Sequence, residues 1–466
     1  MVVDAGRVVG EVDERLFGSF LEHMGRAIYG GIFEPGHPTA DDEGFRGDVL
    51  ELVRELGVTI VRYPGGNFVS GYDWEDGVGP RSSRPQRRDL AWRSIEPNTI
   101  GTDDFLSWAA KAGVEPMLAI NLGTRGADAA AGLVAHCQGA VRTWCLGNEM
   151  DGPWQIGHKD AVAYGTLARD AAQAMRSVDP GLELVVCGSS HSGMPTFGTW
   201  EETVLELTFE HIDHISLHTY YDPARFKSVD EFLACSRDLD GMITRVTAIA
   251  DEAAARRGSS KRIGLSVDEY NVWHMTANRT HERAGAPFEH APAIAEDTYT
   301  VADALAVGSL LITLLRHADR VRIACLAQLV NVLPAIRTLD GGPAWRQTIF
   351  HPFMHASRYG RGTVLRIDPG HPQLDATAVR NAGALTLFLV NRASDPACLA
   401  APIHGLDGLA PIEHLALTDP DLSAANTADH PDRVTPRALR TPRLEGTTLH
   451  AELPARSWNV LRLRRP

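Results

Sequence analysis

The sequence predicts an α/β protein with two parts. These are a (β/α)8 TIM barrel over residues 15–355 and a C-terminal antiparallel, jelly-roll-like β-sandwich over residues 356–466. Three observations lead to this prediction. Eight apolar runs, each ending in polar or glycine-rich residues, precede residue 355, and helical segments lie between them. After residue 355, apolar and polar residues alternate with period two.

The eight apolar runs are interpreted as the parallel strands of the barrel. They cover residues 15–23, 59–67, 115–123, 142–149, 182–190, 214–221, 262–270 and 322–331, with helical periodicity between them over 45–57, 103–113, 161–179 and 238–258. Such alternation indicates a parallel sheet covered on both faces, and eight units fit a closed barrel better than an open sheet. No phosphate loop or GxGxxG motif follows the first run, which disfavours a dinucleotide-binding fold.

The second part is predicted to be a β-sandwich. Residues 377–394, 412–419 and 447–465 alternate with period two and are separated by Pro, Gly and Asp turns. Residues 1–14 include VVDAGRVVGEV, which also has the composition of a strand. A strand outside a barrel needs another sheet to pair with, so we expect this segment to join the sandwich.

The net charge limits which partners the protein can bind. The chain has 466 residues and a net charge of −14, which argues against nucleic-acid binding because phosphate contacts need clustered Lys and Arg.

The sequence also indicates a cellular location. The longest apolar stretch, residues 304–315, is shorter than the roughly 20 residues of a membrane span. The N-terminus lacks a secretory pattern, and six scattered cysteines without a CxxC pair suggest buried free thiols. We therefore expect a cytoplasmic protein.

Polar residues gather where the predicted strands end, which is the active-site face of such a barrel. They are Glu22, His23, Arg62, Gly66, Asn67, Asn121, Asn148, Glu149, His218, Tyr220, Tyr221, Asp268, Glu269, Gln328 and Asn331, with Trp273 just beyond. Carboxylates and amides suit the hydroxyls of a sugar, and aromatic rings suit its face. We expect His23 and His218 to form ordinary hydrogen bonds, so neither a metal nor a cofactor is predicted.

Glu149 and Glu269 are the pair that indicates chemistry. Glu149 lies in WCLGNEMDGPW (144–154) at the end of the fourth strand, and Glu269 ends the seventh. Those strand ends face each other across the barrel mouth, so both carboxyls can reach one point. Two carboxylates that flank one glycosidic bond are the arrangement of a glycosidase. A single glutamate of this kind more often caps a helix or pairs with an arginine, but the pair favours catalysis.

Several long motifs resemble those of one family. They are FGSFLEHMGRAIYGGIFEPGHP (17–38), RYPGGNFVSGYDWEDGVGP (62–80), TWCLGNEMDGPWQIGHK (143–159), VVCGSS (185–190), ISLHTYY (215–221), DEYNVW (268–273), IACLAQLVNVLPAI (323–336) and PFMHAS (352–357). Together they are similar to the intracellular α-L-arabinofuranosidases of glycoside hydrolase family 51. The similarity covers the whole barrel and, more thinly, the sandwich.

The resemblance implies a role for individual residues. It assigns Glu149 as the general acid/base, Glu269 as the nucleophile and Asn148 as a ligand of the sugar 2-hydroxyl. The remaining positions that match the family are Glu22, Asn67, Tyr220 and Gln328 in the −1 pocket, and Trp273 and Trp92 on the aglycone side. It also implies arabinose-containing oligosaccharides as substrates and a hexameric assembly.

Two departures from the family pattern stand out. The family usually has Trp at the position of Tyr270, directly after the predicted nucleophile. Family members also carry a longer segment where this chain has only Gly139–Val141. A link from helix to strand lies at the foot of a barrel, so we expect the catalytic centre to be unaffected. Folding stability and subunit contacts are what the shorter segment could change.

The mechanism expected for this pair is retaining hydrolysis by double displacement, with carboxyl groups about 5 to 5.5 Å apart. Three alternatives remain open at this stage. They are another glycosidase on the same scaffold, such as a β-xylosidase or endoglucanase, a catalytically inactive sugar-binding protein, and a sugar isomerase or metal enzyme. The natural substrate, its linkage and the oligomeric state are not determined by the sequence.

Overall fold

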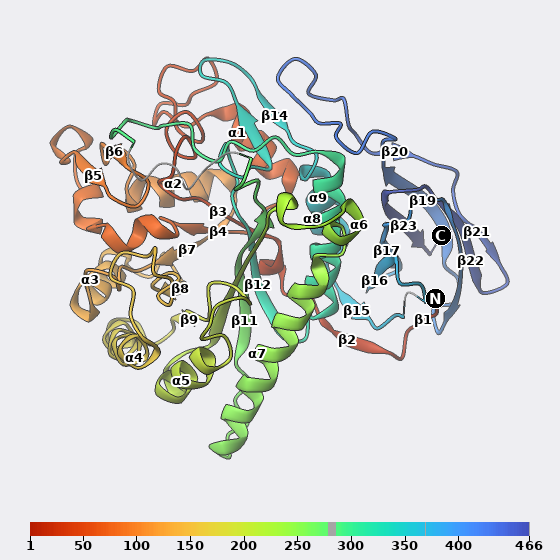
Figure 1. Cartoon of the computed structure of the whole chain (residues 1–466), viewed down its shortest axis with the longest axis horizontal. Coiled ribbons are helices and arrows are strands. Elements are labelled where there is room, and N and C mark those ends of the chain that lie inside the picture. Colours follow the sequence, from red (N-terminus) through yellow and green to blue (C-terminus); the bar gives the residue numbers. More distant parts are fainter. Residues whose placement is uncertain (278–285, 369, 466) are drawn as a thin grey trace.

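The structure is a computed structural model of the chain, and it describes residues 1–277, 286–368 and 370–465. Its larger part is a closed barrel of eight strands in which every neighbouring pair is parallel, as predicted (Figure 1). In chain order the strands are β3 (Gly18–Phe20), β4 (Ile60–Tyr63), β7 (Glu115–Ala119), β8 (Thr143–Leu146), β9 (Glu183–Val186), β10 (His214–Tyr221), β11 (Gly264–Val272) and β12 (Val321–Leu326).

Helices surround the barrel because each presents an apolar stripe to the strands. The main ones are α1 (Gly47–Leu56), α2 (Thr102–Ala112), α3 (Ala127–Cys137), α4 (Ala161–Val178), α5 (Thr199–Thr208), α7 (Ser236–Arg256), α8 (Val301–Arg316) and α9 (Phe350–Tyr359), with α6 (Val229–Phe232) a single turn. Their ends have local causes. Gly57 and Gly113 take the left-handed conformation that stops α1 and α2, and Thr300 with Asp303 forms a capping box at the start of α8.

The apolar run at 304–315 is helix α8, which is buried on almost every side. One side faces the barrel and the other faces strands of the sandwich, so no polar face is needed. Gly308 marks the close contact, since a Cβ there would lie 2.7 Å from the ring of Trp458. Among the described helices, none is both long and apolar enough to cross a membrane.

The second part is a sandwich of two sheets, ordered β1-β18-β22-β21 and β2-β15-β16-β17-β23-β19-β20. The strands are β1 (Val3–Asp4), β2 (Val8–Glu11), β15 (Thr363–Leu365), β16 (Leu374–Asn381), β17 (Ala384–Asn391), β18 (Ala397–His404), β19 (Ala410–Leu417), β20 (Arg437–Ala438), β21 (Arg443–Glu445), β22 (Thr448–Leu453) and β23 (Ser457–Arg464). Leucines on the inner faces of both sheets form its own core.

The N-terminal segment does join the sandwich, but as two strands where one was expected. A turn at Gly6 separates β1, which pairs parallel to β18, from β2, which pairs antiparallel to β15. Each sheet therefore gains one edge strand from this segment (Figure 1). Valines lie on both sides of this turn, so a strand-like composition alone could not reveal the break.

The cysteines are all free, and all but Cys398 are buried.

The link between α3 and β8, where the sequence predicts the shortened segment, is short. Helix α3 ends at Cys137 and β8 begins at Thr143, and the short link uses positive φ at Gln138 and Gly139 to reverse direction. It enters β8 at the end opposite Glu149, so it lies at the foot of the barrel.

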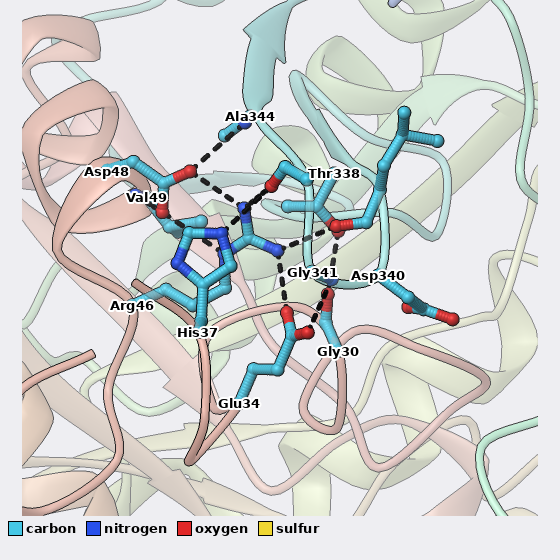
Figure 2. A network of polar contacts seen from close by, with 12 residues as sticks. Gly30, Glu34, His37, Arg46, Asp48, Val49, Thr338, Asp340, Gly341 and Ala344 are labelled. Atoms are coloured by element: carbon cyan, nitrogen blue, oxygen red, sulfur yellow. Dashed lines mark hydrogen bonds and ion pairs between the residues drawn. The ribbon is translucent and has the colours of Figure 1, made fainter. Parts of the chain in front are cut away.

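Two long loops over the barrel mouth are joined by a buried arginine, and we call this group the Arg46 clamp. Arg46 donates to the carboxylates of Glu34 and Asp48, which are close to it in the chain (Figure 2). It also donates to the backbone carbonyls of Leu339 and Gly342, which are far from it in the chain. Those carbonyls belong to the hairpin of β13 (Ile336–Thr338) and β14 (Ala344–Arg346). The clamp thereby ties the loop that follows β3 to the loop that follows β12, the two strands that meet where the barrel closes.

Candidate functional site

Glu149 and Glu269 lie together at the barrel mouth, where the sequence placed them. His218, on β10, stands between them. Its Nδ1 is 3.0 Å from Glu149 Oε1 and 3.7 Å from Glu269 Oε2. These three atoms all lie within 4.8 Å of one another, so the two carboxyl groups face a common point.

Glu149 follows β8 in a conformation that is uncommon for its residue type, with φ of +43°. Its side chain is 11% exposed, and its withdrawal from water, followed by the charge of Glu269, raises its pKa. Two hydrogen bonds act in the opposite direction. His218 Nδ1 faces Oε1, and Trp154 Nε1 donates to Oε2 at 2.6 Å. Trp154 comes from the loop after β8 and is 46% exposed, so it forms part of the rim.

Glu269 has a different environment, because a cation and a phenol hold it. Arg62 Nη1 donates to Oε1 at 2.7 Å, and the Tyr220 hydroxyl donates to Oε2 at 2.7 Å. Arg62 is buried on β4 and lies over the ring of Phe20. A guanidinium at this distance is a charge-assisted donor to the carboxylate. The two glutamates therefore have different hydrogen-bond partners, a histidine and an indole for Glu149 and a guanidinium and a phenol for Glu269.

An irregularity in β11 places a third carboxylate beside them. The pairing of β10 with β11 moves from Ser216–Ser266 to His218–Glu269, so β11 contains one residue more than its neighbour. This bulge lets two consecutive residues, Asp268 and Glu269, both face the barrel interior. Asp268 Oδ1 lies 3.1 Å from His218 Nε2, and its Oδ2 lies 3.6 Å from Arg62 Nε.

Glu22, just after β3, bonds residues that were predicted to accompany it. Its Oε1 accepts from Phe68 N at 2.9 Å and Trp92 Nε1 at 2.8 Å. Gln328 accepts from the Glu22 backbone N–H at 3.0 Å. Burial, with a contribution from the charge of Glu269, raises the pKa of Glu22 to about 8. Trp92 reaches Glu22 from the hairpin of β5 (Arg87–Asp89) and β6 (Ser94–Glu96).

Gly66 separates Glu22 from Glu269. A Cβ at Gly66 would lie 3.2 Å from Glu269 Oε1 and 3.4 Å from Glu22 Oε2. A larger residue there would press against both carboxylates. The loop after β4 therefore needs glycine at this position for space, and Asn67 follows it directly on the half-buried start of a short 3-10 turn.

Two buried donors at the site have no hydrogen-bond partner among the described residues. They are Asn148 Nδ2 and Trp273 Nε1. The Asn148 amide is oriented by Arg62, whose Nη2 donates to its Oδ1 at 2.7 Å. Trp273 packs edge-on against Tyr220, with ring centroids 5.1 Å apart. Buried donors are normally satisfied, so these two are positioned to bond a ligand's hydroxyl or ring oxygen.

The two histidines named from the sequence form hydrogen bonds, as expected. His23 Nδ1 lies 2.8 Å from Glu96 Oε2, and its Nε2 lies 2.7 Å from the Tyr63 hydroxyl. The cluster of Glu149, His218 and Glu269 was not foreseen as a possible ligand set, yet its atoms are close enough to hold a cation. These atoms already bond one another, Arg62 and Tyr220, so the cluster is a hydrogen-bonded group.

The structure brings the predicted glutamates, Asn148, Tyr220, Gln328 and the two tryptophans together, with Asn67 next to Gly66 in the chain. Asn121 and Asn331 instead bond residues outside this group. Arg62, Asp268 and Trp154 also belong to the site, although the sequence predicts no role for them. A signal existed for Arg62, because an arginine inside the apolar run TIVRYPGGN needs a buried acid to pair with. No local signal identifies Asp268, since its inward direction depends on the bulge.

A (β/α)8 barrel whose mouth holds two unlike buried glutamates defines the class of glycoside hydrolases. The comparisons with known proteins agree. The family model described as the α-L-arabinofuranosidase 1 domain matches residues 52–237, and the model of the α-L-arabinofuranosidase C-terminal domain matches residues 268–457.

Individual relatives resemble the chain over its whole length. It is 49% identical to an intracellular exo-α-(1→5)-L-arabinofuranosidase of Bacillus subtilis, covering 100% of this chain and 99% of the relative. It is 45% identical to an exo-α-(1→6)-L-arabinofuranosidase of Bifidobacterium longum, covering 100% and 97%. The solved structure of AbfB, a family 51 α-L-arabinofuranosidase from Bifidobacterium longum, matches with a TM-score of 0.94, 44% identity and 99% coverage of both chains.

The chain therefore belongs to the α-L-arabinofuranosidases of glycoside hydrolase family 51, and it is an enzyme. The alignment with the Bacillus subtilis relative spans 497 positions against the 466 residues of this chain, so this chain is the shorter one. That the missing residues belong between α3 and β8 stays a prediction.

Proposed function

We propose that this enzyme removes terminal α-L-arabinofuranose from arabino-oligosaccharides by double displacement with retention of configuration. Glu269 attacks the anomeric carbon while Glu149 gives its proton to the departing oxygen, which leaves an arabinosyl ester on Glu269. Water then attacks the same carbon, its proton passes to Glu149, and the ester bond breaks. The second step returns to Glu149 the proton that the first step used.

The approach of the two carboxyl groups carries this proposal. Their facing atoms lie within 4.8 Å. This supports the retaining class, with about 5 to 5.5 Å between carboxyl groups, over the inverting class, with about 6.5 to 9.5 Å. The unlike environments support the division of roles, because Arg62 and Tyr220 donate to both oxygens of Glu269, while burial raises the pKa of Glu149 and favours its protonated form.

The other site residues are proposed to hold the sugar. Asn148 would donate its unpaired Nδ2 to the 2-hydroxyl, and Tyr220 would position the nucleophile as it bonds Oε2. The remaining −1 contacts are assigned to Glu22, Asn67 and Gln328, and the aglycone border to Trp273 and Trp92. We propose no cofactor and no metal in the reaction.

The cellular setting and assembly are proposals drawn from relatives. Those at 49% and 50% identity are named intracellular, which suggests imported oligosaccharides as substrates. Their names specify 1→5 linkages, whereas one relative at 45% identity is named for 1→6 linkages, so both should be assayed. We propose a homo-oligomer, by family resemblance a hexamer, and a division of the chain at residues 14 and 355.

The test uses 4-nitrophenyl α-L-arabinofuranoside with the wild type, Glu149→Ala and Glu269→Ala, and with Glu452→Ala as an exposed control. We expect both site variants to lose activity and the control to keep it. Azide should restore turnover of Glu149→Ala and yield the α-azide, because two displacements retain configuration. With Glu269→Ala, azide would instead give the β-azide in a single displacement.

Other outcomes would redirect the proposal. Release of β-arabinofuranose by the wild type would overturn double displacement. Cleavage of a xyloside or a glucan in place of the arabinoside would keep the scaffold and replace the substrate. Unchanged activity of either glutamate variant would overturn its assigned role.

A further inference from the structure

Asp268 is buried next to the site, although neither step of the proposed mechanism uses it directly. Its side chain is 1% exposed and meets His218, Arg62 and Cys145, whose thiol donates to Oδ2 at 3.4 Å. A buried carboxylate is costly unless cations or donors surround it. The bulge in β11 interrupts the regular pairing with β10 and so places Asp268 there. Because bulges often lie next to active sites, this placement points to a function.

The contacts of His218 show what Asp268 does. Both ring nitrogens face carboxylate oxygens, Nδ1 toward the two glutamates and Nε2 toward Asp268. In the ester intermediate Glu149 is ionised, and a carboxylate only accepts hydrogen bonds, so the ring then satisfies both sides only when each nitrogen carries a hydrogen. Without Asp268, a single proton on Nδ1 would be enough for the glutamates. Asp268 is the contact that holds the second proton on the ring.

We propose that Asp268 is a positioning residue that keeps His218 a cation between the two catalytic glutamates while the arabinosyl ester exists. This rests on the proposed double displacement. Once Glu269 becomes an ester, its negative charge is gone, and one of the two charges that favour a charged imidazole beside Glu149 goes with it. Asp268 keeps its charge through the whole cycle. His218 therefore remains a donor to Glu149 when that glutamate must be ionised to accept the proton of water.

The groups around the pair fit this role. Burial opposes the charge on His218, while Glu269, Asp268 and Glu149 together raise its pKa to about 10. Arg62, on β4, and His218 hold the pKa of Asp268 below its usual value against the effect of burial. The other titratable neighbours are the thiols of Cys145, Cys187 and Cys325 and the Tyr220 phenol; burial raises the pKa of all four, so they stay neutral.

The proposal predicts that the second chemical step depends on Asp268 more than the first. In Asp268→Asn, which keeps the shape but removes the charge, we expect kcat on 4-nitrophenyl α-L-arabinofuranoside to fall by about 10- to 100-fold. The fall in kcat/KM should be smaller than about fivefold, since the first step uses protonated Glu149. A burst of nitrophenol should appear as the ester accumulates. The acidic limb of the kcat profile should move to higher pH, and azide should restore kcat.

Two further variants separate this role from a merely structural one. His218→Gln removes the imidazolium itself and should give the same burst. This variant also tests the proposal if Asp268→Asn does not fold. The double variant should be no slower than the slower of the two single variants. The matched control is Asp48→Asn in the Arg46 clamp. This variant also removes a carboxylate that pairs with a buried arginine, but the pair is not part of the site. The control should lower stability without a burst or a shifted limb.

Equal falls of kcat and kcat/KM, with no burst and an unmoved acidic limb, would overturn the inference. The result is distinct from failure of the proposed function. If the wild type retains configuration and needs both glutamates while the Asp268 variant behaves like the control, only this inference is wrong. If the wild type does not form the ester at all, both are wrong.

Discussion

Arg46 and Arg62 are the most deeply buried arginines among the described residues, and their surroundings differ in an informative way. Arg46 is 0% exposed and Arg62 is 1% exposed. Arg46 gives its donors to Glu34, Asp48 and two backbone carbonyls, so all of its bonds go to fixed structural partners. Arg62 bonds Glu269 and Asn148, whose remaining atoms face the site.

The carboxylates beside the two arginines differ as well. The side chains of Glu34 and Asp48 are each 22% exposed, whereas those of Asp268 and Glu269 are 1% and 7% exposed. Partial hydration lowers the cost of the clamp's charges, but the charges at the site are held in the interior at a larger cost. The Arg46 clamp joins loops, and the Arg62 cluster keeps charges where a reaction can use them.

The largest expected effect comes from Arg62→Lys. Lysine keeps the charge but cannot donate in a fork to both Glu269 and Asn148. We expect kcat/KM on the nitrophenyl arabinoside to fall about 10²- to 10³-fold, the size of losing a preorganised donor. Arg46→Lys is the control and should change kcat/KM less than about threefold. Equal losses in both variants would mean that the two arginines do not differ in function.

The converse variant is Arg46→Met, which removes the cation and leaves two carboxylates and two carbonyls without their donor. We expect the free energy of unfolding to fall by about 3 kcal/mol, as for other broken buried pairs. Urea denaturation followed by tryptophan fluorescence measures this, with catalytic constants taken on folded enzyme. A variant as stable as the wild type would show that the loops do not depend on the clamp.

The two clusters should also respond to opposite ends of the pH scale. The pKa of Asp48 is lowered in the folded state, where Arg46 counteracts burial, so its stabilisation is present above about pH 4 and is lost as pH falls. The pKa of His218 is raised to about 10, so its stabilisation is complete below about pH 6.5 and is lost as pH rises toward 10.

Unfolding free energies measured across pH test this opposition. Asp48→Asn should flatten the acid side of the stability curve and leave the alkaline side unchanged. His218→Gln should flatten the alkaline side alone. If Asp48→Asn flattened the alkaline side, or His218→Gln flattened the acid side, the assignment of these pH dependences to the two clusters would be wrong.

The smallest expected effect is that of Glu34→Gln. Glu34 accepts from Arg46 at 2.8 Å and from Gly341 N at 2.7 Å, and an amide oxygen can keep one of these bonds. Because Glu34 is partly hydrated, we expect a loss of about 1 kcal/mol or less in unfolding free energy. A loss as large as that of Arg46→Met would mean that Glu34 carries most of the clamp's stabilisation.

Much of the fold followed from patterns that are local in the chain. Apolar runs with helices between them identified all eight barrel strands, because burial on both faces requires continuous apolar residues. The same patterns placed Glu149 and Glu269 at strand ends, and the known geometry of a barrel brought them to one mouth. The motifs then assigned a family that the comparisons confirm.

Other features depended on pairing between distant segments. The bulge in β11 exists only relative to β10, so the sequence could not show that Asp268 turns inward beside Glu269. The division of the first residues into β1 and β2 depends on which sheet edges lie nearby. Arg46 could be read as one more charged residue before a helix, because the carbonyls that bury it come from the loop after the last barrel strand.

By itself, then, the sequence determined the class of fold and the family, and it predicted the two glutamates, since periodicity and strand ends are properties of single segments. Only the tertiary structure decided what surrounds those glutamates. The register between neighbouring strands sets which side chains face inward, and it is selected by the packing of the whole barrel. The charge on His218, and with it the role we infer for Asp268, is a consequence of that packing.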